Sequence, residues 1–169
     1  MIDPDKDGID HINIYTKGKT ELGRLLTNLA DTPFTHEDYG HFKSVEGLWY
    51  WLISGKTQDE FKNMSGFEAK KMGKLIPEEN KCPVDDDFKE AIKKGFKAKV
   101  RENKKIIKLL YESTLPFEHY YFYGKDGNYK VMEMERHKWQ CEEFERLRTI
   151  IKDFYNNKKN NSIPYKNKI

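Results

Sequence analysis

Two kinds of hydrophobic periodicity divide this chain, and their arrangement limits the folds open to it. Apolar residues recur at the spacing of amphipathic helices in segments that begin near residues 20, 44, 65, 86 and 104, and again over residues 139–155. Strand-like patterns are confined to residues 11–15 and to two β-rich runs, 117–123 and 129–134, which flank an Asp-Gly turn signal. This order predicts an α+β fold: a single, mainly helical domain with a small antiparallel β element.

Capping residues mark where several of these helices begin. Ser44 and Asp86 each precede an apolar helical stripe, and Ser65 with Glu68 forms the Ser-x-x-Glu pattern of a capping box. Asn103 interrupts the stripe that starts at Asp86, so we expect a kink there.

The length of 169 residues is enough for one domain with one sizeable core. Hydrophobic residues make up only 37% of the chain but aromatic residues 14%, so burial must depend on rings. We expect a flexible N-terminus over residues 1–10, the folded domain over residues 11–155, and a mobile basic tail, rich in lysine and asparagine, over residues 156–169.

Charge and cysteine content exclude several classes of protein. The net charge of +3, from 31 basic and 28 acidic residues, lacks the excess typical of a nucleic-acid coat protein. Cys82 and Cys141 lie far apart without a CxxC motif, which predicts reduced thiols and neither a disulfide framework nor a zinc site. No apolar run approaches the roughly 20 residues of a spanning helix, and no leader is recognisable. The expected location is the cytoplasm.

Familiar cofactor and catalytic motifs do not occur in the sequence. It contains no GxGxxG, GxxxxGK[ST], HExxH or GxSxG motif. We therefore expect neither a cofactor nor a metal.

Glu46 is the first candidate for chemistry. At 100° per residue it lies beside Tyr50 and Ile53, at the edge of the apolar stripe and near the start of its helix. Burial would raise the pKa of this carboxyl and the helix N-terminus would lower it, and a carboxyl tuned in this way suits stabilisation of a sugar cation or activation of water. The more common alternative is a first-turn glutamate that only interacts with the helix dipole.

Several lysines also lie where packing would favour apolar residues. Lys99 falls in the centre of an apolar stripe, and Lys70, Lys71 and Lys74 share the same ambiguity, because Lys71 lines up with apolar neighbours. A desolvated lysine could bind phosphate or form a Schiff base, whereas a lysine that extends past the stripe to solvent would have no chemical role.

Aromatic tracts could hold a planar base. They are residues 119–124 and residues 49–51, although aromatic strand residues are more often part of a core.

Four segments, in order, resemble the NADAR (YbiA-like) family. The stretch Leu26–Leu29 with Pro33-Phe34 resembles that family's "LSNF…P" signature, and Gly40–Glu46 resembles "G..f.SVEH". Ala69–Lys74 is similar to "AKRLGR", and Ala98-Lys99-Val100 with Asn103 is similar to "KF..NP". Together with Leu109-Leu110 these segments span about residues 12 to 124.

The resemblance implies an N-glycosidase that removes ADP-ribose from modified guanine in nucleic acid, or that cleaves a related riboside such as a riboflavin precursor. Glu46 matches the functional glutamate of the family, and Lys70 and Lys99 are candidates for binding phosphate or forming a sugar Schiff base. The substrate would be an ADP-ribosylated nucleic acid or nucleotide. The residues expected to line its cleft are Asn28, His41, Trp49, Tyr50, Tyr123 and Gly124.

Three positions depart from the family pattern. Gly47 replaces a histidine, Ile53 replaces a lysine, and Tyr120 replaces an aspartate. Either the site has been rebuilt, or the chain binds ADP-ribose or a related nucleotide without cutting it. A third alternative is a nucleic-acid-binding accessory protein that uses the lysines of its tail, which are Lys158, Lys159, Lys166 and Lys168.

Overall fold

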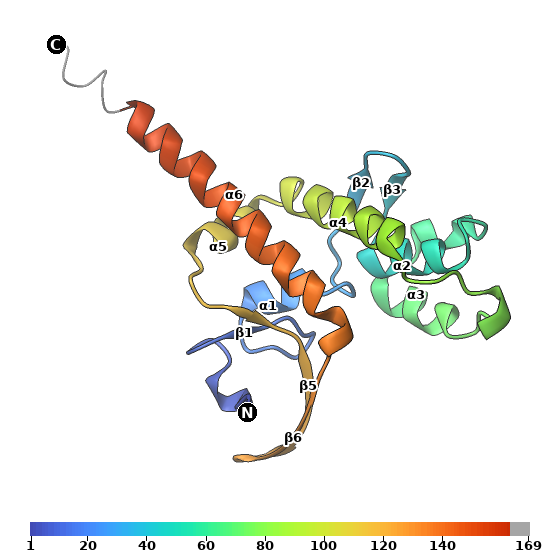
Figure 1. The fold of residues 1–169 in the computed structure, drawn as a ribbon, viewed down its shortest axis with the longest axis horizontal. Coiled ribbons are helices and arrows are strands. Elements are labelled where there is room, and N and C mark those ends of the chain that lie inside the picture. Colours follow the sequence, from blue (N-terminus) through green and yellow to red (C-terminus); the bar gives the residue numbers. More distant parts are fainter. Residues whose placement is uncertain (163–169) are drawn as a thin grey trace.

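Helices form most of the ordered chain, and the computed structural model describes residues 1–162 (Figure 1). The α-helices are α1 (Glu21–Leu26), α2 (Val45–Ile53), α3 (Gly66–Gly73), α4 (Asp86–Arg101), α5 (Lys104–Glu112) and α6 (Lys138–Ser162). Short 3-10 helices are η1 (Pro4–Lys6), η2 (Asp59–Asn63), η3 (Glu78–Asn80) and η4 (Glu135–His137). The strands are β1 (Ile12–Asn13), β2 (Phe34–His36), β3 (Gly40–Phe42), β4 (Phe117–Glu118), β5 (Tyr120–Lys125) and β6 (Asn128–Glu133). The prediction of a single α+β domain is confirmed.

The strands form three separate two-stranded sheets rather than one β element. The hairpin β5–β6 is antiparallel, as expected, and its turn has Asp126 at φ 50° and Gly127 at φ 78°, the left-handed values that a type I′ turn requires. A second antiparallel pair, β2–β3, and a parallel pair, β1–β4, were not predicted. Strands of two or three residues are too short to leave a periodic signal.

The core is centred on the crossing of α2 and α4. Leu48 of α2 and Ile92 and Phe96 of α4 are fully buried. A Cβ at Gly95 would lie 2.6 Å from Leu48 Cδ2, so the absence of a side chain at Gly95 lets the two helices come together.

Most of the predicted helix boundaries agree with the observed caps. Ser44 Oγ accepts a hydrogen bond from Gly47 N at 3.0 Å, and Ser65 forms the expected capping box with Glu68. The cap of α4 is Asp85 rather than Asp86, because Asp85 Oδ1 accepts from Phe88 N at 2.9 Å. Asn103 caps α5, so the expected kink is a break between two helices.

Residues 11–14 are buried throughout, which corrects the expectation of a half-buried strand. Asn13 can lie in the interior because its side-chain amide forms hydrogen bonds with the backbone of Tyr120, as the backbone of a neighbouring strand would. Its Nδ2 donates to Tyr120 O and its Oδ1 accepts from Tyr120 N, both at 3.1 Å.

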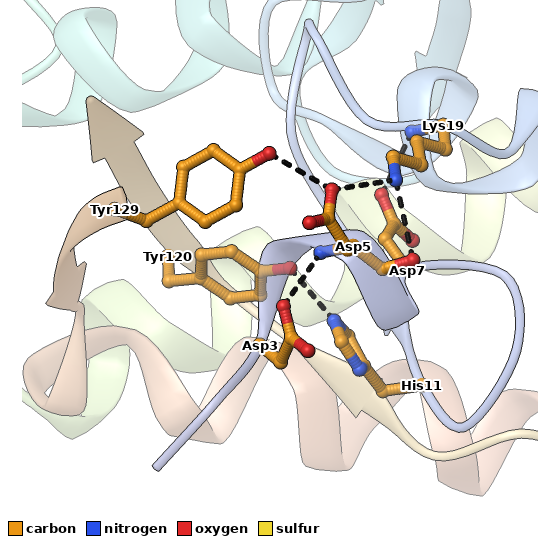
Figure 2. Close-up of polar contacts among 7 residues, drawn as sticks. All are labelled: Asp3, Asp5, Asp7, His11, Lys19, Tyr120 and Tyr129. Carbon is orange, nitrogen blue, oxygen red and sulfur yellow. Dashed lines mark hydrogen bonds and ion pairs between the residues drawn. The ribbon is translucent and has the colours of Figure 1, made fainter. Parts of the chain in front are cut away.

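The N-terminal segment packs against the domain, whereas the sequence predicted a flexible residue range 1–10. Asp7 is buried and accepts hydrogen bonds from Asn13 N at 3.0 Å and from Lys19 N at 2.7 Å. Asp5 accepts a hydrogen bond of 2.8 Å from the hydroxyl of Tyr129 on β6 (Figure 2). These aspartates have backbone and hairpin partners that the local sequence does not reveal.

The last helix is longer than its hydrophobic pattern indicated. Helix α6 continues through residues 156–162, which the sequence assigned to the tail, and here Asn156 and Lys159 still contact Tyr111 of α5. The rest of the predicted tail, with Lys166 and Lys168, lies outside the described residues. Within residues 1–162, no helix is both long and apolar enough to cross a membrane.

Candidate functional site

Glu46 lies in the first turn of α2, where the loop after α1 meets the helix. Its amide donates a 2.9 Å hydrogen bond to Asn28 O, so this loop is fixed to the start of the helix. The neighbouring residue, Gly47, lies against η2, and a Cβ there would be 2.5 Å from Phe61 O. The position has no room for the histidine of the family pattern.

The carboxyl of Glu46 is strongly desolvated although part of the side chain remains accessible. Burial raises the pKa of Glu46 to about 7, and the positive charges of Lys70 on α3 and of Lys74, which follows its last residue, partly oppose the rise. Neither lysine forms an ion pair with Glu46 within the part of the chain that the structure describes. The carboxyl therefore keeps its oxygens available for a ligand and titrates near neutral pH.

Two tyrosines share this environment with Glu46. Burial, followed by the negative charge of Glu46, raises the pKa of Tyr50 and that of Tyr121. Tyr50 is one turn further along α2, and its ring packs on Phe61 with 6.0 Å between centroids. A Cβ at Gly73 would lie 2.1 Å from Tyr50 Cδ1, so α3 touches the ring directly. This close approach places the α3 lysines near the carboxyl.

On the hairpin, the tyrosine whose pKa is raised by the charge of Glu46 is Tyr121, whereas the sequence predicted a role for Tyr123. Tyr121 pairs with Met132 and Tyr123 pairs with Lys130, so all of these side chains lie on one face of the ribbon. Tyr123 is 63% exposed and continues that face toward the turn. The alternation of β5 could have identified Tyr121, because it puts residues 121 and 123 on the same side.

The hairpin also explains why Gly124 is a glycine. It has φ 113°, and a Cβ would lie 2.1 Å from Asn128 O on the paired strand. The observed contacts give it a role in the backbone of the ribbon rather than in substrate binding.

Lys99 is completely buried, which excludes the interpretation that it extends to solvent. Its Nζ donates a 2.8 Å hydrogen bond to Thr27 O, and burial lowers the pKa of Lys99 to about 7. It is not among the charges that affect the pKa of Glu46. The charge of Lys70 thus acts on the Glu46 carboxyl, whereas Lys99 is buried and bound to the backbone carbonyl of Thr27.

The other predicted site residues lie at different distances from this centre. Trp49 packs on Phe88 at 4.7 Å and on His137 at 5.8 Å between ring centroids, and so belongs to the contact of α2 with α4 and η4. His41 is exposed on β3 opposite Thr35, and no described contact joins it to Glu46. Asn28 is partly exposed, and its backbone carbonyl accepts the hydrogen bond from the amide of Glu46.

Ile53 and Tyr120, the other two residues that depart from the family pattern, are buried in the interior. Ile53 is 7% exposed within the core, and its carbonyl accepts a hydrogen bond from Cys82 N at 2.8 Å. Tyr120 is fully buried, and its hydroxyl lies 2.7 Å from His11 Nε2 (Figure 2). Neither side chain lies near Glu46 through any described contact, so the polar groups around the carboxyl come from other positions.

A groove beside the site was not predicted from the sequence. It has a volume of about 420 Å³ and lies between the loop after α1 and the start of α3. Its lining residues are Thr16, Arg24, Thr27, Leu29, Ala30, Asp31, Lys43, Ser65, Gly66 and Phe67. These residues come from separate loops and helix ends, so no local motif could have indicated them.

Comparisons with known proteins find no match: no family model, no curated protein and no solved structure is significantly similar to the chain. Within the described residues, no group of three or more histidine, cysteine, aspartate or glutamate side chains is placed to hold a metal ion.

Proposed function

We propose that this chain is an N-glycoside hydrolase of the NADAR type, with that family's fold, which removes ADP-ribose from a modified nucleobase in nucleic acid or in a nucleotide. One observation carries the proposal. At the position that resembles the functional glutamate of the family, Glu46 is a desolvated carboxyl with a pKa of about 7, which interacts electrostatically with Tyr50, Tyr121, Lys70 and Lys74. A glutamate that only interacts with a helix dipole would have a pKa at or below its ordinary value.

The chemistry follows from charge at the sugar. As the bond between ribose C1 and the base nitrogen breaks, positive charge develops on the ribose, and the Glu46 carboxylate stabilises it. Water, oriented by the same carboxylate, adds its oxygen to C1 and loses a proton, while the departing base nitrogen gains one. The products are ADP-ribose and the nucleic acid or nucleotide with its base restored.

The neighbouring residues have supporting roles in this scheme. The charges of Lys70 and Lys74 favour the ionised form of Glu46 and attract the phosphates of the substrate. Tyr121 and Tyr123, on one face of the hairpin, offer rings on which the base can stack. Lys99 is a positioning residue, because it is sealed from solvent and holds the loop that meets the first turn of α2.

The proposal is tested with DNA that carries ADP-ribosylated guanosine. Wild type should release ADP-ribose, and Glu46→Gln, which keeps the shape but removes the charge, should be slower by about 10²- to 10⁴-fold. Glu60→Gln is a matched control, since Glu60 is exposed on η2. Equal release by wild type and Glu46→Gln, measured by mass spectrometry, would exclude Glu46 as the catalytic group.

A non-catalytic binder of ADP-ribose is the second candidate. It is favoured by the structural use of Gly47, Ile53 and Tyr120, which removes from the site three polar groups of the family pattern. Calorimetry with an intact ADP-ribosylated nucleoside, followed by mass analysis of the recovered ligand, separates the two functions. A binder returns the ligand uncut, and a hydrolase returns ADP-ribose and the unmodified nucleoside.

A further inference from the structure

The groove between the loop after α1 and the start of α3 has the dimensions of a ligand site. Its volume of about 420 Å³ falls within the range of 300 to 1,000 Å³ typical of small-molecule pockets. It shares its edge with the candidate site, because Thr27 and Leu29 line it and Asn28 between them accepts the hydrogen bond from Glu46 N. A ligand in the groove therefore lies beside the segment that positions Glu46.

Backbone contact forms one side of the groove. A Cβ at Gly66 would lie 2.4 Å from Leu29 Cα and 2.5 Å from Leu29 O, so α3 begins directly against the loop. Only a glycine permits this approach. The first amides of α3 consequently lie at the groove, where a helix N-terminus favours negative charge.

Two cationic side chains line the same groove. Arg24 Nη1 donates to Gly18 O at 2.7 Å and to Lys19 O at 3.0 Å, which fixes the guanidinium. Its remaining N–H groups have no protein partner among residues 1–162. Lys43 is exposed and makes no ion pair in that same part of the chain, although its charge reaches Glu68. A fixed guanidinium and an unpaired ammonium suit the oxygens of a phosphate or diphosphate.

The groove also holds an aromatic ring and a carboxylate. Phe67, the second residue of α3, is 65% exposed, although burial of a phenylalanine would stabilise the fold. An exposed ring at a groove can stack on a planar base. Asp31 is exposed on the loop side and, as a carboxylate, can accept hydrogen bonds from ribose hydroxyls.

We infer that this groove is a binding site for a nucleoside diphosphate, with the base on Phe67, the ribose at Asp31 and the diphosphate between Arg24 and Lys43. This inference rests on the proposed function only for the orientation of the ligand in the groove. If Glu46 cleaves at a ribose, the groove holds the adenosine diphosphate half of the ligand, and the second ribose extends past Asn28 to the carboxyl. The hairpin face with Tyr121 and Tyr123 then holds the modified base from which ADP-ribose is removed.

Calorimetry with ADP tests the site directly, without any turnover. Wild type should bind ADP more tightly than adenosine or pyrophosphate, since each of these lacks one half of the recognised chemistry. Phe67→Ala and Lys43→Glu should each weaken ADP binding roughly tenfold, as expected for loss of one stacked ring or one phosphate contact. Matched controls further along α3 are Met72→Ala and Lys71→Glu, because both residues are exposed and neither lines the groove.

The possible outcomes separate this inference from the proposed function. Failure of wild type to bind ADP, or equal weakening by the groove variants and the α3 controls, would overturn the groove assignment. Glu46→Gln should keep ADP affinity, because it lies outside the groove lining. Intact ADP binding with no hydrolysis by wild type supports the groove and contradicts the hydrolase. Hydrolysis with an unchanged KM in Phe67→Ala and Lys43→Glu supports the hydrolase and contradicts the groove.

Discussion

Glu46 and Lys99 are both desolvated and both have a pKa near 7, yet their surroundings differ. The Glu46 carboxyl has no hydrogen-bond partner in the described part of the chain, retains some access to solvent and lies among tyrosines and lysines. The Lys99 ammonium is completely enclosed and is bound to Thr27 O. A shifted pKa therefore does not by itself identify a reacting group. What distinguishes Glu46 is that its carboxyl has no hydrogen-bond partner among the described residues and that the residue is not fully enclosed.

The largest expected effect is on the pH dependence of hydrolysis. If the Glu46 carboxylate is the required form, kcat/KM should approach a tenfold fall per pH unit below pH 7, and should be about fiftyfold lower at pH 5 than at pH 7. Lys99→Met should keep this acid limb. Loss of the limb in Lys99→Met, with activity otherwise retained, would reverse the roles of the two residues.

The next effect concerns the free energy of unfolding above neutral pH. The pKa of Lys99 is lowered from 10.5 to about 7 in the fold, so the unfolded chain binds the extra proton between these values and Lys99 makes stability rise with pH across that window. This contribution should be about 2 kcal/mol between pH 7 and pH 9. Urea unfolding of wild type and Lys99→Met at both pH values measures it, and parallel pH dependences would show that Lys99 is not sealed.

Glu46 should have the opposite effect on how the free energy of unfolding depends on pH. Its pKa is raised from 4.5 to about 7, so the folded state binds the extra proton and stability falls as pH rises through this window. Glu46→Gln should therefore be more stable than wild type by about 3 kcal/mol at pH 8 and close to it at pH 4.5. A variant that is less stable than wild type at pH 8 would mean that the carboxylate has a stabilising partner.

The smallest effect is expected at the rim of the site. Tyr123→Ala should weaken substrate binding about tenfold through loss of a stacked ring, with little change in Tm, because Tyr123 is 63% exposed. Tyr120→Phe is a contrasting variant, since it removes a hydroxyl that lies 2.7 Å from His11 Nε2 in the interior and should lower Tm. A sharp fall in Tm for Tyr123→Ala, with unchanged ligand affinity, would assign Tyr123 to the core.

Features that depend on neighbours in sequence were predictable. The Ser44 and Ser65 caps, the break at Asn103 and the turn at residues 126–127 all follow from local hydrogen bonds and permitted φ values. The position of Glu46 at the edge of a buried stripe follows from helical periodicity, and its desolvation agrees with that position.

Features that join distant segments were not predictable. Asp7 is buried because Asn13 and Lys19 supply amide donors, and nothing in residues 1–10 indicates those partners. The parallel pair β1–β4 joins segments about a hundred residues apart. The groove likewise exists only because Leu29 and Gly66 come into contact. Each of these depends on the tertiary arrangement, which periodicity does not encode.

The contact of Gly73 with the Tyr50 ring has a consequence for how this protein can change under mutation. Helix α3 has Phe67 near its start, Lys70 in its middle and Gly73 at its end. Even one methyl group at residue 73 would meet the ring at 2.1 Å, so either the ring or the whole helix must shift. Movement of the helix would displace the groove and the lysines together. A single replacement at position 73 would therefore disturb both binding regions. In a variant library of this chain, fewer replacements should be tolerated at Gly73 than at its exposed neighbours.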